Sequence, residues 1–238
     1  MNQRHFNALL AVELTRARPA VTRLAIATPL ALGVFWLLGR ATPENLLLVT
    51  LGAGLGVAVG AVSSNVVRDQ FDRTLELFVA LPTTAGTLAA AKLAAGALVP
   101  LPWAVATGIV FAIGPPQGVR LGDPAGMAAG VLVAAWCALA ALSWVFTAVW
   151  ARFAPNRAGM FPLALMVLAA LVDSIGGRVL RLFGVRDVSA ALLHLLEAPW
   201  LPLAAALAGA ALFAGVGWIS FAITRRALRQ YRPTGAEL

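Results

Sequence analysis

The residues best placed to do specific work lie in the stretch 66–92, between two long apolar segments. Six polar side chains fall within nine positions there: Arg68, Asp69, Gln70, Asp72, Arg73 and Glu76. At about 100° per residue, Asp69, Arg73 and Glu76 would share one helical face. Phe71, Leu75 and Phe78 would share the opposite face.

Pro82 marks the end of this stretch, because proline cannot continue a helix and restricts the residue before it. Asp69 and Arg73 form an acid-to-base pair at the favoured i,i+4 spacing, which stabilises a helix by about 0.2–0.5 kcal/mol. The pattern indicates a short amphipathic helix along a membrane surface. A solvated loop that joins two spans is the alternative.

Motifs for catalysis and for cofactor binding are missing from the sequence. It contains no G-x-x-x-x-G-K-[ST] loop for ATP phosphates and no H-E-x-x-H. Its two histidines, His5 and His194, are far apart and have no cysteine partners at metal-binding spacing. We therefore expect no catalytic residues, no metal and no cofactor in this chain.

The composition indicates an integral membrane protein. Of 238 residues, 61% are apolar and 12% are charged, and the mean hydropathy is +0.86. A soluble domain carries about 25% charged residues. The net charge of +8 does not indicate a nucleic-acid partner, because the basic residues lie in short loops between apolar runs, where they report topology.

Apolar run lengths predict an all-α membrane protein, one transmembrane domain over 1–238, with six spans. We expect these spans at about 20–38, 46–67, 87–113, 124–150, 158–175 and 201–223. Pro100 and Pro102 should kink the third span. Residues 176–199 are too rich in charge for a span, and their helical spacing predicts short interfacial or re-entrant helices. Asp173, just before them, is expected to form a local ion pair or to lie at the interface, and a buried functional carboxylate is the alternative.

Residues 4–18 form a predicted amphipathic helix that lies in the interface. Glu13 interrupts its apolar stripe, so we expect this carboxylate to pair with a cation or to face a partner. An ordinary basic flank of the first span is the alternative for this segment.

Three glycines on one face of the second predicted span, Gly52, Gly56 and Gly60, form two overlapping G-x-x-x-G steps. Such steps allow two helices to approach very closely. The contact could be static packing within one subunit, or a face that shifts against a neighbour during transport. Gly54 lies on another face.

Basic residues divide unequally between the two sides of the predicted topology. With six spans and both termini inside, thirteen lie inside and five lie outside, as the positive-inside rule requires. The inner residues are Arg4, Arg16, Arg18, Arg23, Arg68, Arg73, Lys92, Arg152, Arg157, Arg225, Arg226, Arg229 and Arg232. The outer ones are Arg40, Arg120, Arg178, Arg181 and Arg186. This orientation places 68–82 in the cytoplasm.

The stretch 68–82 also resembles the cytoplasmic coupling segment of ABC-2-type transporter permeases. Arg73-Thr74-Leu75-Glu76-Leu77 and Ala80-Leu81-Pro82 carry most of the resemblance, with Lys92 following. The small glycine that often precedes Thr-Leu-Glu in such proteins is Arg73 here. The resemblance extends over nearly the whole chain, with 4–18 similar to the family's N-terminal elbow helix and 176–199 to its extracytoplasmic helices.

The resemblance implies a permease subunit of an exporter in the cell membrane, not an enzyme. A separate ATP-binding cassette subunit would hydrolyse ATP and push on 68–82, and a second permease copy or a related chain would complete the pathway. The cargo would be a drug, natural product, peptide or lipid, because the spans offer almost no charge. The haem-exporter permease of cytochrome c maturation is an alternative, and a membrane-embedded enzyme or assembly factor without an ATPase is another.

Overall fold

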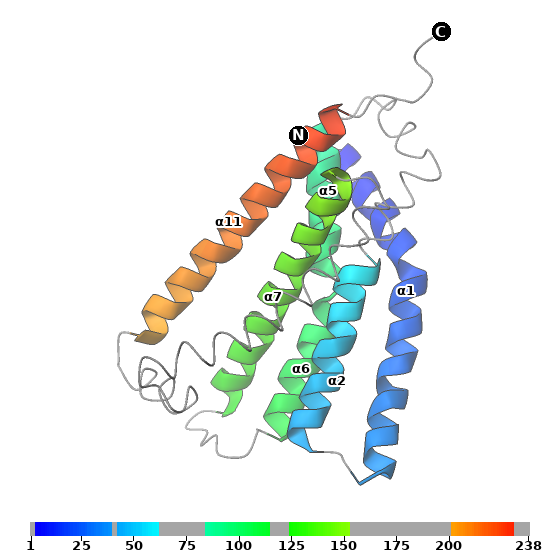
Figure 1. The fold of residues 1–238 in the computed structure, drawn as a ribbon, viewed down its shortest axis with the longest axis vertical. Coiled ribbons are helices and arrows are strands. Elements are labelled where there is room, and N and C mark those ends of the chain that lie inside the picture. The colour runs from blue at the N-terminus through cyan, green and yellow to red at the C-terminus, as the bar shows by residue number, and fades with distance from the viewer. Residues whose placement is uncertain (1–2, 40–41, 62–83, 115–123, 153–200, 231–238) are drawn as a thin grey trace, which may run out of the picture. The chain divides into compact units, whose positions relative to one another are not determined.

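The computed structural model describes residues 3–39, 42–61, 84–114, 124–152 and 201–230, and every regular element in these ranges is a helix (Figure 1). The chain divides into two compact units, one of residues 1–152 with 216–238 and one of 153–215. All contacts described below lie within the first unit. Of the second unit the structure describes 201–215, the first half of α11.

Helix α1 (Gln3–Leu37) is continuous over 35 residues, with Pro19 and Pro29 inside it. The predicted interfacial helix 4–18 and the predicted span 20–38 are both helical, but the expected break between them is absent. The reason is packing on both sides of Pro19. Leu9 packs in one buried cluster, and Ala17 packs with Val21 in the next one.

Helix α2 (Pro43–Gly56) continues into a π-helical turn, η1 (Val57–Ala61), where the described part of the second predicted span ends. The helix begins three residues before the predicted start at 46. Thr42 caps it, since its hydroxyl accepts a hydrogen bond from the Asn45 backbone N–H at 3.3 Å. Pro43 follows at the first helical turn, where its missing N–H costs nothing.

The third predicted span consists of two helices, α5 (Ala85–Leu98) and α6 (Leu101–Ile113). The break falls at Val99 and Pro100, so the predicted kink is confirmed. Thr84 caps α5 by accepting a hydrogen bond from the Thr87 backbone N–H at 3.2 Å. A proline at this break removes the N–H that would have continued the hydrogen-bond ladder.

Helices α7 (Pro124–Arg152) and α11 (Leu201–Gln230) correspond to the fourth and sixth predicted spans. The end of α11 lies seven residues beyond the predicted boundary at 223. This extension is stabilised by packing, because Leu228 is buried in a cluster with Leu88 and Ala89 of α5.

Two glycines let helices of the first unit approach closely. A Cβ on Gly108 of α6 would lie 2.9 Å from the Leu132 Cβ and 3.2 Å from the Ala128 carbonyl oxygen, both on α7. A Cβ on Gly54 of α2 would lie 2.8 Å from the Leu139 Cδ1 and 3.1 Å from the Trp103 Cβ. At both positions an added Cβ would require atoms of the neighbouring helix to shift.

The predicted glycine face of α2 and η1 makes fewer close contacts with neighbouring helices than Gly54 does. Among the described residues, no atom lies within 4 Å of a Cβ on Gly52 or Gly60, and the nearest atom to one on Gly56 is the Leu24 Cδ1 at 3.8 Å. The close approach in the described bundle is therefore made by Gly54, the glycine on the other face. A packing role for the three-glycine face stays a prediction.

Hydroxyl groups link the helices in the apolar interior. The Trp103 indole N–H of α6 donates to the Thr28 hydroxyl of α1 at 3.1 Å, and the Thr107 hydroxyl donates to that of Thr50 on α2 at 3.3 Å. The Thr28 and Thr50 hydroxyls in turn donate to carbonyl oxygens of their own helices. Such interhelical bonds are worth about 0.6–2 kcal/mol in membrane proteins.

Three described helical stretches are long and apolar enough to cross a membrane: Gln3–Leu37, Ala85–Ile113 and Gly126–Arg152. Asn45–Gly60 is a shorter apolar helix. The chain is therefore an all-helical, membrane-embedded protein in its described ranges. The predicted span 158–175, the helices predicted in 176–199 and the segment 68–82 lie outside those ranges.

The crossing at Gly108 gives a stability test. We expect Gly108→Ala to lower the melting temperature of the purified protein, because its Cβ meets a backbone carbonyl and a Cβ that cannot swing away. Overpacking of this kind costs about 1–3 kcal/mol. The matched control is Gly52→Ala, which adds a methyl group to open space and should leave stability unchanged or raise it by up to about 1 kcal/mol. Equal melting temperatures for the two variants would contradict the observed packing.

Candidate functional site

A buried ion pair joins α1 to α5. The Lys92 Nζ donates a hydrogen bond to the Glu13 Oε1 at 2.6 Å, and the two side chains are 2% and 3% exposed. The expectation that Glu13 pairs with a cation is confirmed, and the cation is the only lysine in the chain. Glu13 is also the one acidic residue whose side chain the structure describes.

Helical spacing on both partners directs these two side chains inward. On α1, Leu9, Glu13 and Ala17 are buried at four-residue intervals, which is one face of a helix. On α5, Leu88, Lys92 and Gly96 repeat the same spacing and are also buried. The charged pair therefore lies within a continuous apolar contact between two helix faces.

An apolar cluster closes one side of the ion pair. It joins the first turns of α1, the first turns of α5 and the last turns of α11. Its members are the buried Leu9, Leu88, Ala89, Ala91 and Leu228, with the partly buried Phe6, Ala85 and Phe221 packed against them. The cluster excludes water and lipid from the pair and strengthens the attraction between the two charges.

Helix α7 contacts α5 next to the residue that forms the ion pair. The Trp144 indole N–H donates to the carbonyl oxygen of Leu93, the residue after Lys92, at 2.8 Å. Opposite the indole lies Gly217 of α11, where a Cβ would be only 2.8 Å from the ring. Trp144 thus lies between this turn of α5 and Gly217 of α11.

The π-helical turn η1 also contacts α7. The Ser143 hydroxyl donates to the Ala58 carbonyl oxygen at 3.3 Å, and Val57 and Ala58 are fully buried. A π turn widens the helix and redirects its carbonyl groups, and such turns occur frequently at functional sites. Val57 belongs to the cluster that contains Ala17 of α1, four residues after Glu13. The irregular end of α2 therefore packs close to the ion pair along α1.

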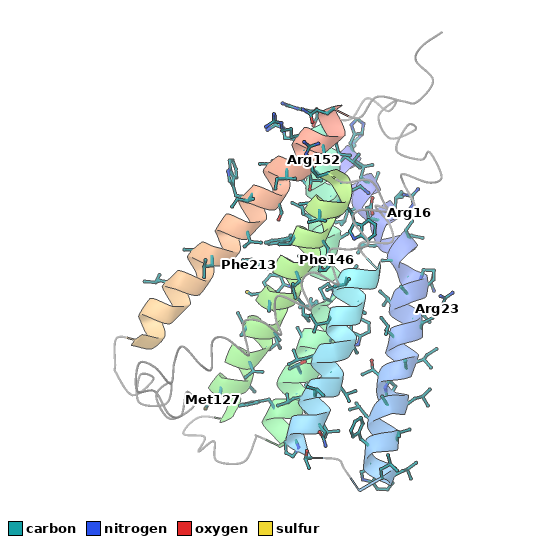
Figure 2. The ribbon with its side chains drawn as sticks, viewed as in Figure 1. Arg16, Arg23, Met127, Phe146, Arg152 and Phe213 are labelled. Atoms are coloured by element: carbon teal, nitrogen blue, oxygen red, sulfur yellow. The ribbon has the colours of Figure 1, made fainter. Side chains whose placement is uncertain are left out.

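Basic residues gather at the end of the first unit where α1 and α5 begin and α7 and α11 end (Figure 1). We name it the cationic end, and its described basic residues are Arg4, Arg16, Arg18, Lys92, Arg152, Arg225, Arg226 and Arg229. Arg23 lies farther along α1 and is exposed, whereas Arg152 lies at the last turn of α7 (Figure 2). The described residues near the opposite helix ends carry no arginine or lysine.

Helix length gives the depth of the ion pair. Lys92 precedes Ile113, the last residue of α6, by 21 positions, which correspond to about 31 Å of helix. Glu13 precedes Leu37, the last residue of α1, by 24 positions, or about 36 Å. A bilayer has a hydrocarbon core of about 30 Å. The pair therefore lies about one hydrocarbon thickness away from the opposite ends of these helices.

The predicted coupling residues lie outside the described ranges: Asp69, Gln70, Phe71, Asp72, Arg73, Leu75, Glu76, Phe78 and Pro82. The same is true of Asp173 and His194. In the ranges that are described, no group of three or more His, Cys, Asp or Glu residues could hold a metal ion. Cys137 is a free, half-buried thiol on α7.

Lys92 as the partner of Glu13 was not predicted from the sequence. Two signals in the sequence point to it: Glu13 interrupts an apolar stripe, and Lys92 is an isolated cation at the start of a long apolar run. The contact cannot be predicted from the sequence pattern, because the two residues are 79 positions apart. Periodicity shows which residues share a helix face but not which other helix that face contacts.

Comparison with known proteins returned no match among family models, curated proteins or solved structures. The class of protein therefore rests on the fold and the site themselves. The chain is an α-helical membrane-embedded protein, with a charged pair enclosed where three helix ends meet.

A double-mutant cycle tests the energetics of the pair. We expect Glu13→Leu alone and Lys92→Met alone each to cost about 3–5 kcal/mol, because each leaves one charge buried without its counter-charge. The double variant should be close to the wild type, since an apolar pair of similar size replaces both charges. Thermal or urea unfolding in detergent measures all four proteins. Additive losses in the double variant would contradict a direct buried interaction.

Proposed function

We propose that this chain is the permease subunit of an ABC-2-type ATP-driven exporter. ATP hydrolysis takes place on a separate ATP-binding cassette subunit, because the sequence has no phosphate-binding loop. A second permease copy or a related chain completes the pathway in a cell membrane, with six spans per chain and both termini in the cytoplasm.

The observation that carries this proposal is the position of the two helices that flank residues 62–83. Helix α5 begins at the cationic end, and η1, the end of α2, packs against α7 through Ser143 and against Ala17 of α1. The chain therefore leaves and re-enters the described bundle toward the end where basic residues gather. By the positive-inside rule that end faces the cytoplasm, where an ATP-binding subunit is available.

The contacts of α5 support a mechanical role for the predicted coupling segment 68–82. Helix α5 follows this segment directly, and its first turns are packed against α1 and the end of α11. Trp144 of α7 bonds to its middle. A displacement delivered to the start of α5 therefore reaches three other helices, which is what switching a transport pathway between its two sides requires.

The chemistry of the described helices supports an amphipathic or hydrophobic cargo. Beyond the cationic end their side chains are apolar, apart from Arg23, the hydroxyl, indole and amide groups, and Glu44, whose side chain is not described. A pathway lined by such helices offers few charges to a small inorganic ion. We therefore assign a drug, natural product, peptide or lipid as the cargo class.

Orientation is tested by cysteine labelling in intact cells. We expect Asp187→Cys in a Cys137→Ala background to react with a membrane-impermeant maleimide, because residue 187 belongs to a predicted outer segment. Asp72→Cys in the same background should react only after the membrane is permeabilised. The reverse pattern would overturn the proposed orientation and the cytoplasmic position of 68–82.

Coupling is tested with the tagged chain purified from its native membrane together with its ATP-binding subunit and reconstituted in vesicles. We expect Phe71→Ala with Phe78→Ala to insert normally, to recover less ATPase subunit and to lose transport-linked ATP hydrolysis by at least about tenfold, because buried aromatic anchors dominate binding. The matched control is Ile26→Ala with Leu30→Ala, two exposed apolar residues of α1. Unchanged recovery of the ATPase subunit and unchanged ATP hydrolysis in the Phe71 and Phe78 variant would contradict the proposed coupling role.

A further inference from the structure

The surfaces that meet between α1 and α5 each carry one charged residue among apolar ones. Leu9, Glu13 and Ala17 are buried at four-residue intervals on α1, and Leu88, Lys92 and Gly96 are buried at the same intervals on α5. Sliding α1 along α5 by one helical turn, about 5.4 Å, would move each residue by one such interval. The contacts of the apolar residues distinguish less between neighbouring registers than the contact of the two charges does.

The ion pair does distinguish between them. A shift of one turn would separate the Lys92 Nζ from the Glu13 Oε1, which now lie 2.6 Å apart, and would break the buried contact between the two charges. Replacing a buried ion pair by apolar residues is often neutral for stability, so stability does not explain why this pair is present. Fixing a register is the best-attested use of buried polar groups.

The Glu13–Lys92 contact connects two helices whose positions affect the rest of the first unit. Helix α1 is continuous from Gln3 to Leu37, so its first half cannot shift along α5 without moving the second half. Helix α5 is held in turn by the Trp144 indole at Leu93, the residue next to Lys92. The register of the Glu13–Lys92 contact therefore sets the position of α1 against the rest of the first unit.

We propose that Glu13 and Lys92 are positioning residues whose ion pair locks α1 and α5 in a single register, so that the two helices move as one body when the permease changes state. The register lock is a property of this chain alone. Its consequence for transport rests on the proposed function.

The test separates the lock from simple stability by measuring a distance. Spin labels are attached to Asn7→Cys on α1 and Leu98→Cys on α5, both exposed positions, in a Cys137→Ala background in lipid nanodiscs. Three proteins are compared at positions 13 and 92: Glu13→Leu with Lys92→Met removes both charges, Glu13→Lys with Lys92→Glu exchanges them, and the third protein keeps the natural pair. Double electron–electron resonance gives the label-to-label distance distribution of each.

We expect one narrow distance in the wild type and in the charge-exchanged protein. The apolar double variant should keep its melting temperature and yet show a second distance displaced by about one helical turn, about 5.4 Å. Thr28→Val is the matched control, because it removes another bond that α1 makes, the one to Trp103, without touching the ion pair. This control should retain the single narrow distance.

A single unchanged distance in the apolar double variant would overturn the register lock, and so would a second distance in the Thr28→Val control.

The link to transport is measured separately, in the vesicles that contain the ATP-binding subunit. There the apolar double variant should lose transport-linked ATP hydrolysis by at least about tenfold and the exchanged variant should retain it. A broadened distance with normal hydrolysis would leave the lock standing and overturn its role in transport. Absence of any co-purifying ATPase would refute the proposed function and not the lock.

Discussion

The arrangement of the described bundle depends on one interaction, the hydrogen-bonded ion pair between Glu13 and Lys92. Neither charge can be buried alone, because removing a carboxylate or an ammonium group from water costs several kcal/mol per ion. The first half of α1 packs along α5 with the two charges in contact. The segment 4–18, which the sequence pattern predicts to lie in the membrane interface, is part of a continuous 35-residue helix.

The elements around the pair share its level in the bundle. The Trp144 indole of α7 donates a hydrogen bond to the α5 turn that carries Lys92. The apolar cluster at the start of α5 includes Leu228 from the last turns of α11. The π-helical turn η1 packs against Ala17, one helical turn after Glu13. Rigid contacts and an irregular turn thus occur together near one predicted membrane boundary. This combination suits a protein that transmits displacement between helices, since packed elements switch between discrete arrangements and do not deform continuously.

Much of the helical architecture could be predicted from the sequence, because apolar run length and proline position are local signals. The break at Pro100 and the membrane class followed from them. The continuity of α1 did not, since Pro19 and the basic residues around it indicate a boundary and only tertiary packing on both sides removes it. Gly54 shows a second limit: spacing showed that Gly52, Gly56 and Gly60 share a face, but only the fold reveals that Gly54 meets Trp103 and Leu139. The Glu13 partner was a third such case, because sequence pattern shows that a buried charge needs a counter-charge and does not say which one.

The most direct test of this account is the chemical reactivity of Lys92. It is the only lysine in the chain, so one ε-amine reports on the ion pair without any substitution. The chain in lipid vesicles, and a sample unfolded in detergent, are treated with an amine-acylating reagent, and the peptide that contains Lys92 is quantified by mass spectrometry. We predict that Lys92 stays unmodified in the native protein and is modified in the unfolded one, because its amine is buried and bonded to Glu13. Native modification at the rate of an exposed lysine would contradict the enclosed ion pair and the account that depends on it.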